Sequence, residues 1–375
     1  MPPDSILNKC KDLGQLFSEL GLITDQESYF DSKITTLFSE NELKKVVDFS
    51  GANQNLSPTE EAEFFYYTCK FCANTRNYFL VSLGMVASTI QNYGTTGQRD
   101  RIGTQLLSGS MVGSLAITEP NAGSNLEEIS SNYEIINEDE FRINGCKRWI
   151  TLGGIASIVL LAATGEKGLQ LFIVETSKHK VDRREYRNLL CNRGSHIAEL
   201  SFKDLKLSRK DLLGENFKTS AEALRFALMN GRAIASIAAV AMSHAALEEA
   251  ISFANKRKQF GKRITEHQLI QKMISEAWSN IHAGKCLAIE AFQAKRNPGL
   301  LALQSCANAK LFTSKAMQKI TSDCIQIIGS AGISNELSAE RYFREAKAFE
   351  FIEGTTQVLE QLCALGAISK TPKLW

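Results

Sequence analysis

The first part of the chain carries apolar residues at helical spacing. Leucine and phenylalanine recur every three or four positions from Leu13 to Leu20, which places them on one face of a helix. Gly21 follows directly and is expected to end that helix. Residues 57–60, Ser-Pro-Thr-Glu, carry the signals of a further helix start, with proline in the first turn and an acidic residue after it. More helices are predicted at 78–93 and 98–107.

The pattern changes after Ser110. Residues 111–118 are apolar and uncharged, as expected of a buried strand, and the next seven residues, EPNAGSN, have the composition of a loop. Alternating segments follow, and Asn144-Gly145 is a strong signal for a hairpin turn. The further strands are predicted at 133–136, 140–143, 158–163, 169–175 and 196–207. This pattern predicts a small antiparallel β domain.

Helical spacing returns after Gly214 and continues to the end of the chain. The pattern predicts one long helix over residues 219–256, whose many alanines permit close packing against other helices. The remaining helices are predicted at 266–295, 300–328, 343–352 and 356–368. Long helices joined by short loops indicate an up-and-down bundle.

Composition narrows the functional classes. The 375 residues include 43 basic and 41 acidic side chains, and this balance argues against a nucleic-acid partner. No segment reads as a membrane span or as an apolar leader, so no membrane association is expected. The nine cysteines form no framework; Cys69 and Cys72 lack a second pair that would complete a zinc site. We expect no metal, and free thiols in a reducing cytoplasm.

One late stretch, Phe343–Gln357 (FREAKAFEFIEGTTQ), combines an apolar run with an acid. Glu353 follows Phe351 and Ile352 directly. A carboxylate among apolar residues has a raised pKa, which suits proton abstraction next to a carbonyl. The alternative is a helix that ends at Ile352 with Glu353 in solvent, and this stretch alone favours the alternative.

Six short motifs accompany this order of helices, strands and helices. They are TEPNAGS at 118–124, RWIT at 148–151, RKQFG…HQ at 257–268, QIIGSAG at 326–332, REAK at 344–347 and IEGT at 352–355. Together they resemble the signature motifs of the acyl-CoA dehydrogenase superfamily, and six in order are far more specific than one. The resemblance implies a mainly α fold with a central β domain. Its three parts would be an N-terminal helical domain, a middle β domain and a C-terminal four-helix bundle, at 1–110, 111–214 and 215–375.

The resemblance also implies an FAD cofactor. Thr118 and Ser124 would then bond the flavin or the substrate beside it, Trp149 would pack against the isoalloxazine, and Thr151 would bond its N5 side. A planar apolar wall with a few placed donors suits this ring. Trp149 has an alternative reading as an ordinary core residue between the sheet and the bundle.

Further residues would bind the rest of the cofactor. Thr355 and Gln357 would meet its diphosphate and adenosine parts, and Gln268 also belongs to a cofactor-binding motif. The residues implied to reach the FAD of a neighbouring subunit are Arg257, Phe260, Gln326 and Gly329. Arginine and backbone N–H groups near glycine suit a diphosphate. The alternatives are a solvated helix-end charge for Arg257, a core position for Phe260 and a helix contact for Gln326.

Glu353 lies where the superfamily's commonest catalytic base is found. The resemblance implies that it removes the α-proton of an acyl thioester while the β-hydride passes to flavin N5, and that a backbone N–H at this position polarises the thioester carbonyl. Arg232 is the candidate for contact near the substrate; the alternative is a buried structural ion pair. Asn125 and Cys191 depart from the superfamily pattern and leave the acyl group open.

The closer resemblance is to dehydrogenases of antibiotic extender-unit pathways, which oxidise hydroxy- or aminoacyl groups on an acyl carrier protein. The features that carry it are Gly231-Arg232, residues 259–261, residues 267–270, Trp278 and residues 350–352. The alternatives are a short- or medium-chain dehydrogenase of free CoA esters, a flavin oxygenase or oxidase on the same scaffold, and a non-enzymatic assembly protein. An electron-transfer flavoprotein is a candidate electron acceptor. Because Arg257 would serve a partner's cofactor, a homotetramer or homodimer is expected.

Overall fold

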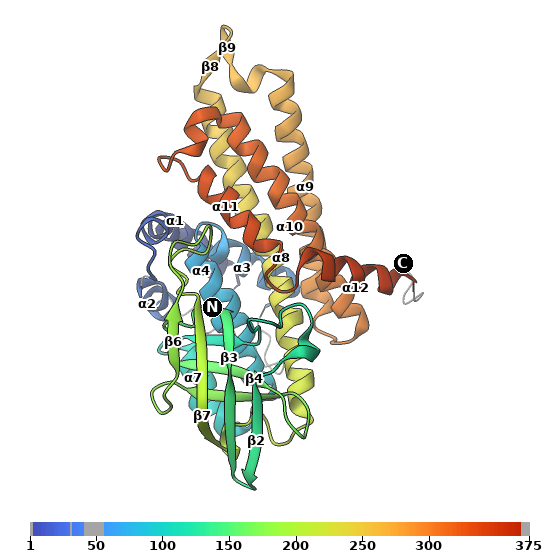
Figure 1. The fold of residues 1–375 in the computed structure, drawn as a ribbon. Helices are drawn as coiled ribbons and strands as arrows, with labels where there is room; N and C mark the ends of the chain where they lie inside the picture. Colours follow the sequence, from blue (N-terminus) through green and yellow to red (C-terminus); the bar gives the residue numbers. More distant parts are fainter. Residues whose placement is uncertain (1–2, 31, 41–55, 369–375) are drawn as a thin grey trace.

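The computed structural model describes residues 3–30, 32–40 and 56–368 (Figure 1). Helices come first, two β-sheets follow, and a bundle of long helices closes the chain. This confirms the predicted fold class. The residue limits 110 and 214 between the domains stay a prediction, and residues 41–55 and 369–375 lie outside the described part.

The N-terminal helices enclose an aromatic core. Their bounds are α1 (Pro3–Glu27), α2 (Lys33–Glu40), α3 (Pro58–Cys69), α4 (Ala73–Asn77), α5 (Ser88–Tyr93), α6 (Thr96–Gln98) and α7 (Thr104–Leu107), with π-helical segments at Tyr78–Ala87 and Arg99–Gly103. Phe17, Phe38 and Phe64 all contact Phe79, with ring centroids 5.7–6.3 Å apart.

Two helix signals had different outcomes. The predicted start at Ser57 is confirmed, because Ser57 and Glu60 form a reciprocal capping box at the start of α3. The predicted end at Gly21 is wrong, since α1 continues to Glu27. A Cβ at Gly21 would lie 2.8 Å from the carbonyl oxygen of Phe71, so this glycine permits α1 to lie close to the segment between α3 and α4 and does not end the helix.

The strands form two packed sheets. One sheet has the order β1 (Gly113–Ala116), β4 (Ile158–Ala163), β5 (Gln170–Glu175), and the other β2 (Asn132–Asn137), β3 (Glu140–Ile150), β7 (Ala198–Ser208), β6 (Asp182–Glu185). Side chains of both sheets meet in the core; the Phe141 and Phe172 rings lie 5.2 Å apart. The middle region is antiparallel as predicted, except that β1 pairs with β4 in parallel.

The predicted hairpin turn at Asn144-Gly145 is wrong. Both residues lie inside β3, where the pairing with β7 shifts between Ile143 and Gly145. The reversal between β2 and β3 falls at residues 138–139. A side chain at Gly145 would overlap Ser131, so Gly145 serves a bulge and a close backbone approach.

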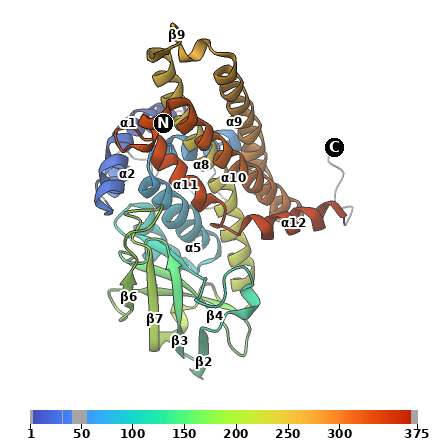
Figure 2. The same ribbon diagram turned by 45° about the horizontal axis from the view of Figure 1, so that its top comes forward.

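The C-terminal helices run along one another. They are α8 (Thr219–Lys256), α9 (Gln268–Ala294), α10 (Leu300–Ile328), α11 (Ala339–Phe349) and α12 (Thr356–Ile368), with a short hairpin of β8 (Lys258–Gln259) and β9 (Lys262–Arg263) at one end. Helix α12 extends away from the bundle (Figure 2). The long predicted helices are confirmed within two residues; α11 begins four residues before the predicted start.

Helix α8 corrects one expectation about membranes. By length and composition it is apolar enough to span a bilayer, with a mean hydropathy of 1.4 in its most apolar window. However, 83% of that window is buried inside the protein. Its alanines pack against α9 and α10, so α8 is a core helix.

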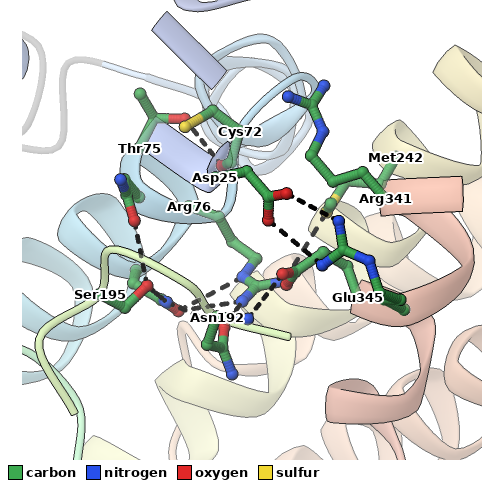
Figure 3. Close-up of polar contacts among 12 residues, drawn as sticks. Asp25, Cys72, Thr75, Arg76, Asn192, Ser195, Met242, Arg341 and Glu345 are labelled. Carbon is green, nitrogen blue, oxygen red and sulfur yellow. Dashed lines mark hydrogen bonds and ion pairs between the residues drawn. The ribbon is translucent and has the colours of Figure 1, made fainter. Parts of the chain in front are cut away.

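A buried ion pair joins the three parts of the chain (Figure 3). Arg76 of α4 bonds Glu345 of α11 at 3.0 Å, and neither side chain is exposed to solvent. The second carboxylate oxygen of Glu345 accepts the backbone N–H of Asn192 at 2.6 Å, and Arg76 also donates to the Asn192 side chain. Asn77 donates to Asn192 and, at 2.7 Å, to Ser195. The network connects α4, the loop between β6 and β7, and α11.

We predict that Glu345→Ala lowers the free energy of unfolding by about 3–5 kcal/mol, because Arg76 would stay buried without its counter-charge. Unfolding in urea, followed by fluorescence, measures this. The matched control is Glu360→Ala, which removes an exposed ion pair with Lys315 and should cost less than about 1 kcal/mol. Equal losses in the two variants contradict a central role for the buried network.

Candidate active site

Glu353 lies in the short turn between α11 and α12. Its backbone is left-handed, with φ +55°, and Gly354 follows with φ +103°. The turn is closed by the N–H of Thr356, which donates to the carbonyl of Glu350 at 2.8 Å. A non-glycine residue in this conformation is strained and is enriched at functional sites. The preceding apolar run is less buried than expected, since Phe351 is 51% exposed.

One carboxyl oxygen of Glu353 has no hydrogen-bond partner in the described chain. The residue is only half-buried as a whole, but its Oε2 is buried and makes no hydrogen bond with any other residue of the chain. A Cβ added at Gly231 of α8 would lie 2.5 Å from this oxygen and 3.0 Å from the methyl group of Met85. The carboxyl group therefore packs against the bare backbone of Gly231, and the Met85 methyl group lies near the same glycine.

Two cations approach the backbone of the same turn. Arg232 donates from Nε to the carbonyl of Glu353 at 3.0 Å, and Lys310 donates from Nζ to the carbonyl of Gly354 at 2.8 Å. Burial raises the pKa of Glu353 to about 7, although the charges of Arg232 and Lys310 oppose this rise. Near neutral pH this carboxyl group can therefore both release and accept a proton, as a general base must.

A buried carboxylate shapes the loop that carries Thr118 and Ser124. Glu119 accepts from Lys147 and from the backbone N–H groups of Ser130 and Ser131, each at 2.8 Å. Burial would raise the pKa of Glu119, but these hydrogen bonds hold it at about 2. Thr118 is half-buried and Ser124 is exposed. Neither hydroxyl bonds another described residue, so both are free to bind a ligand.

Trp149 forms an open aromatic surface beside this loop. It is the next-to-last residue of β3, with φ +63°, and it is 52% exposed. Tyr186 lies against it at 4.5 Å between ring centroids, and Arg148 lies over both rings. This excludes the core reading of Trp149. Thr151 follows and is half-buried, with no hydrogen bond from its hydroxyl to the rest of the described chain.

The other predicted cofactor residues lie elsewhere. The residues at the hairpin end of the bundle, distant from the α11–α12 turn in Figure 1, are Arg257, Phe260, Gln268, Gln326 and Gly329. All five are exposed, Phe260 at 93%, so the core reading of Phe260 and the helix-contact reading of Gln326 are wrong.

The start of α12 carries the last two predicted cofactor residues. Thr355 is half-buried and Gln357 is exposed. The hydroxyl of Thr355 accepts the N–H of Val358 at 3.3 Å, so it already serves as a helix cap. Both residues directly follow the Glu353 turn.

Sequence reasoning missed Gly231 as a contact of the carboxyl group, and Lys310 altogether. Lys310 lies on the buried face of α10 with Cys306, Thr313 and Met317. A single lysine on an apolar helix face could have been recognised in the sequence as a candidate, because burying a charged group costs free energy unless a partner stabilises it. Gly231 gave no such signal, since its role depends on a side chain more than a hundred positions away.

Among the described residues, no group of His, Cys, Asp and Glu is arranged to hold a metal ion. Cys69 and Cys72 are free and buried, and burial raises the pKa of Cys69 to about 12. They are structural thiols at the end of α3.

Comparison with known proteins agrees with this geometry. Residues 114–205 match the model of the acyl-CoA dehydrogenase middle domain, and residues 222–367 match that of its C-terminal domain. A probable acyl-CoA dehydrogenase, YngJ, of Bacillus subtilis strain 168 is 31% identical over 77% of this chain and 77% of its own. The chain belongs to the acyl-CoA dehydrogenase family. A 3-sulfinopropanoyl-CoA desulfinase of Cupriavidus necator is 30% identical over 94% of this chain and 91% of its own.

Solved structures show the same fold. Butyryl-CoA dehydrogenase from Megasphaera elsdenii superposes with a TM-score of 0.90 at 24% identity, over 98% of each chain. The prolyl acyl carrier protein oxidase AnaB gives 0.85 at 22% identity over 97% of each chain. FkbI, described for biosynthesis of a methoxymalonyl extender unit, gives 0.84 at 21% identity, over 95% of this chain and 99% of its own.

The cofactor of this acyl-CoA dehydrogenase is FAD. Family structures contain it, including a glutaryl-CoA dehydrogenase with FADH2 and PigA with FAD and proline. The residues present here fit that group. Trp149 offers an exposed planar surface, and the free hydroxyls of Thr118, Ser124 and Thr151 lie on the segments next to it. The enzyme is a flavin-dependent oxidoreductase.

We predict that Gly231→Ala destabilises the protein by about 1–3 kcal/mol, because the new methyl group overlaps the Glu353 carboxyl group. Urea unfolding measures the loss, and a crystal structure of the variant should show the carboxyl group displaced. The control is Gly97→Ala in α6, where a Cβ meets nothing within 4 Å and helix propensity gives no loss of stability. An unmoved carboxyl group and unchanged stability contradict the packing described here.

Proposed function

We propose that this acyl-CoA dehydrogenase oxidises a short hydroxy- or aminoacyl group held as a thioester on an acyl carrier protein, with Glu353 as the base. The observation that carries the chemistry is the buried, unpaired Oε2 of Glu353 with a pKa of about 7. A carboxyl group with every hydrogen bond satisfied is structural; one with a free buried oxygen is ready to take a proton.

We propose a separate chemical role for each group at the turn. Glu353 Oε2 takes the α-proton of the acyl group. The Glu353 N–H donates to no acceptor in the described chain, and we propose that it polarises the thioester carbonyl. Arg232 holds the Glu353 carbonyl in place and remains the proposed substrate contact. FAD, when bound, supplies the hydride acceptor.

We propose that the remaining sequence-derived cofactor contacts, Thr118, Ser124, Trp149, Thr151, Thr355 and Gln357, bind the FAD of the same subunit. Arg257, Phe260, Gln268, Gln326 and Gly329 would serve a neighbouring subunit's FAD. Their exposure at the bundle end away from Glu353 supports a homotetramer or homodimer. An electron-transfer flavoprotein as the electron acceptor, and a cytoplasmic location, are parts of the same proposal.

Two observations support a short, carrier-bound acyl group. Gly231 packs against the Glu353 carboxyl group, since a Cβ there would lie 2.5 Å from its Oε2, so no acyl chain fits on that side of the carboxyl group. Two proteins of the same fold are named for carrier-bound or extender-unit substrates. The second candidate is a dehydrogenase of free acyl-CoA esters. It is favoured by the relatives of about 30% identity, which are named for CoA esters.

We predict that Glu353→Gln keeps FAD but slows flavin reduction by thioester about 10²–10⁴-fold, the usual contribution of a general base. Stopped-flow absorbance under anaerobic conditions measures the rate, and the bound flavin spectrum shows cofactor retention. Glu222→Gln, at an exposed position in the first turn of α8, is the matched control and should react as wild type. Unchanged reduction in the Glu353 variant moves the base elsewhere.

The substrate is tested by bleaching of the oxidised flavin without oxygen. Short acyl-CoAs are compared with the same and hydroxylated acyl groups on an acyl carrier protein. We predict that only the carrier-bound set bleaches the flavin. Bleaching by free acyl-CoA at equal concentration supports the second candidate, and rapid reoxidation by oxygen afterwards identifies an oxidase.

A further inference from the structure

Lys310 is a buried cation that no established step uses. It lies in the middle of α10, its side chain is fully buried, and it shares its face of the helix with Cys306 and Met317. An ammonium group in such surroundings is costly unless something in the structure favours its charge.

The only hydrogen bond of its Nζ within the described chain goes to a carbonyl. Lys310 donates to the Gly354 oxygen at 2.8 Å and forms no ion pair with a carboxylate of the described residues. Glu353 is the acidic group that favours its charge most, followed by Glu350, while Arg232 opposes it. The lysine therefore bonds the backbone of the residue next to the base, and no hydrogen bond or ion pair in the described chain joins it to either oxygen of the base.

We propose that Lys310 is a positioning residue for the base: its hydrogen bond holds the Gly354 carbonyl in the strained turn, and its charge favours the ionised form of Glu353 in the resting enzyme. This inference rests on the proposed role of Glu353. Arg232 holds the carbonyl one residue earlier, so two cations from α8 and α10 support the left-handed backbone from two helices.

The two titrations are coupled. Burial favours the neutral form of both groups: it raises the pKa of Glu353 to about 7 and lowers that of Lys310 to about 8. The negative charge of Glu353 favours the protonated form of Lys310, and the positive charge of Lys310 favours the ionised form of Glu353. When Glu353 takes up a proton, Lys310 loses the negative charge that stabilises its own. The positive charge of Lys310 thus favours the ionised form of Glu353, and Lys310 does so without a direct bond to the carboxyl group that would block it.

The other groups near the pair do not replace Lys310. Arg232 stays charged at every relevant pH. Glu350 forms an ion pair with Lys347 and, as an acid, supplies no positive charge to Glu353. Burial raises the pKa of the thiols of Cys306 and Cys363, so both are neutral at pH 7. Lys310 is therefore the cation in this group whose charge changes near the pH at which the base works.

The test is the titration of Glu353 in the FAD-loaded enzyme without substrate. Infrared difference spectra between pH values show the carboxylic-acid carbonyl band, and the band missing in Glu353→Gln identifies this residue. We expect a midpoint near 7 in wild type. Lys310→Gln and Lys310→Met should raise the midpoint by about 1 pH unit or more, which is a tenfold or greater rise in proton affinity, because an opposite charge is lost.

Comparing variants separates the effect of the Lys310 charge from the effect of its hydrogen bond to the Gly354 carbonyl. Lys310→Gln keeps a donor for the Gly354 carbonyl, so a purely structural lysine predicts a normal midpoint in this variant. Lys310→Arg keeps the charge and should restore the wild-type midpoint. Lys315→Gln, at an exposed position on the same helix, is the matched control. An unchanged midpoint in Lys310→Gln overturns the proposal.

A reciprocal measurement covers variants that fail to fold. The Lys310 ammonium of the otherwise unaltered chain is followed by nitrogen-15 NMR against pH. The Glu353→Gln substitution must lower the proton affinity of Lys310, and by the same factor by which the charge of Lys310 lowers the proton affinity of Glu353. An unchanged proton affinity of Lys310 contradicts the coupling. Neither experiment uses a substrate. If the two titrations are coupled but no thioester reduces the flavin, the proposed function is refuted and this inference still holds.

Discussion

The arrangement of this enzyme depends on one buried oxygen without a partner. Glu353 Oε2 is removed from water and receives no hydrogen bond from the rest of the described chain, which is costly in a folded protein. The surrounding elements keep it so. Gly231 leaves room for it, Arg232 and Lys310 bond the carbonyl groups of Glu353 and Gly354, and the α11–α12 turn imposes a left-handed conformation. Proton affinity near neutrality follows from that burial.

Two other buried carboxylates show the contrast. Glu345 bonds Arg76 and Asn192, and Glu119 bonds Lys147, Ser130 and Ser131. Their oxygens are satisfied, so they fix structure: the first joins α11 to the N-terminal helices, and the second holds the loop that carries Thr118. The contacts of Glu345 anchor α11, and the turn that carries Glu353 follows that helix. The satisfied carboxylates thus have structural roles, in contrast to the unsatisfied one that we propose as the base.

The local pattern predicted the long helices well because their period extends over many residues. For Thr219–Lys256 and Leu300–Ile328, the predicted first and last residues match the observed ones. It failed where a signal has two physical uses. Gly21 and Asn144-Gly145 read as a helix end and a turn, but close contacts with Phe71 and Ser131 explain these glycines. The parallel pairing of β1 with β4 joins distant segments, which alternation cannot show. Motifs singled out Glu353 and Trp149 as candidates, whereas the contacts of Gly231 and Lys310 with the Glu353 turn form only across helices.

The central claim, that Glu353 removes an α-proton, is tested most directly by hydrogen exchange. An acyl thioester on the carrier protein, altered so that its β-carbon cannot release hydride, is incubated with the FAD-loaded enzyme in D2O. Mass spectrometry then follows deuterium at the α-carbon. The account predicts rapid incorporation with the wild-type enzyme and background incorporation with Glu353→Gln. Equal incorporation by both contradicts it and places the base on another residue.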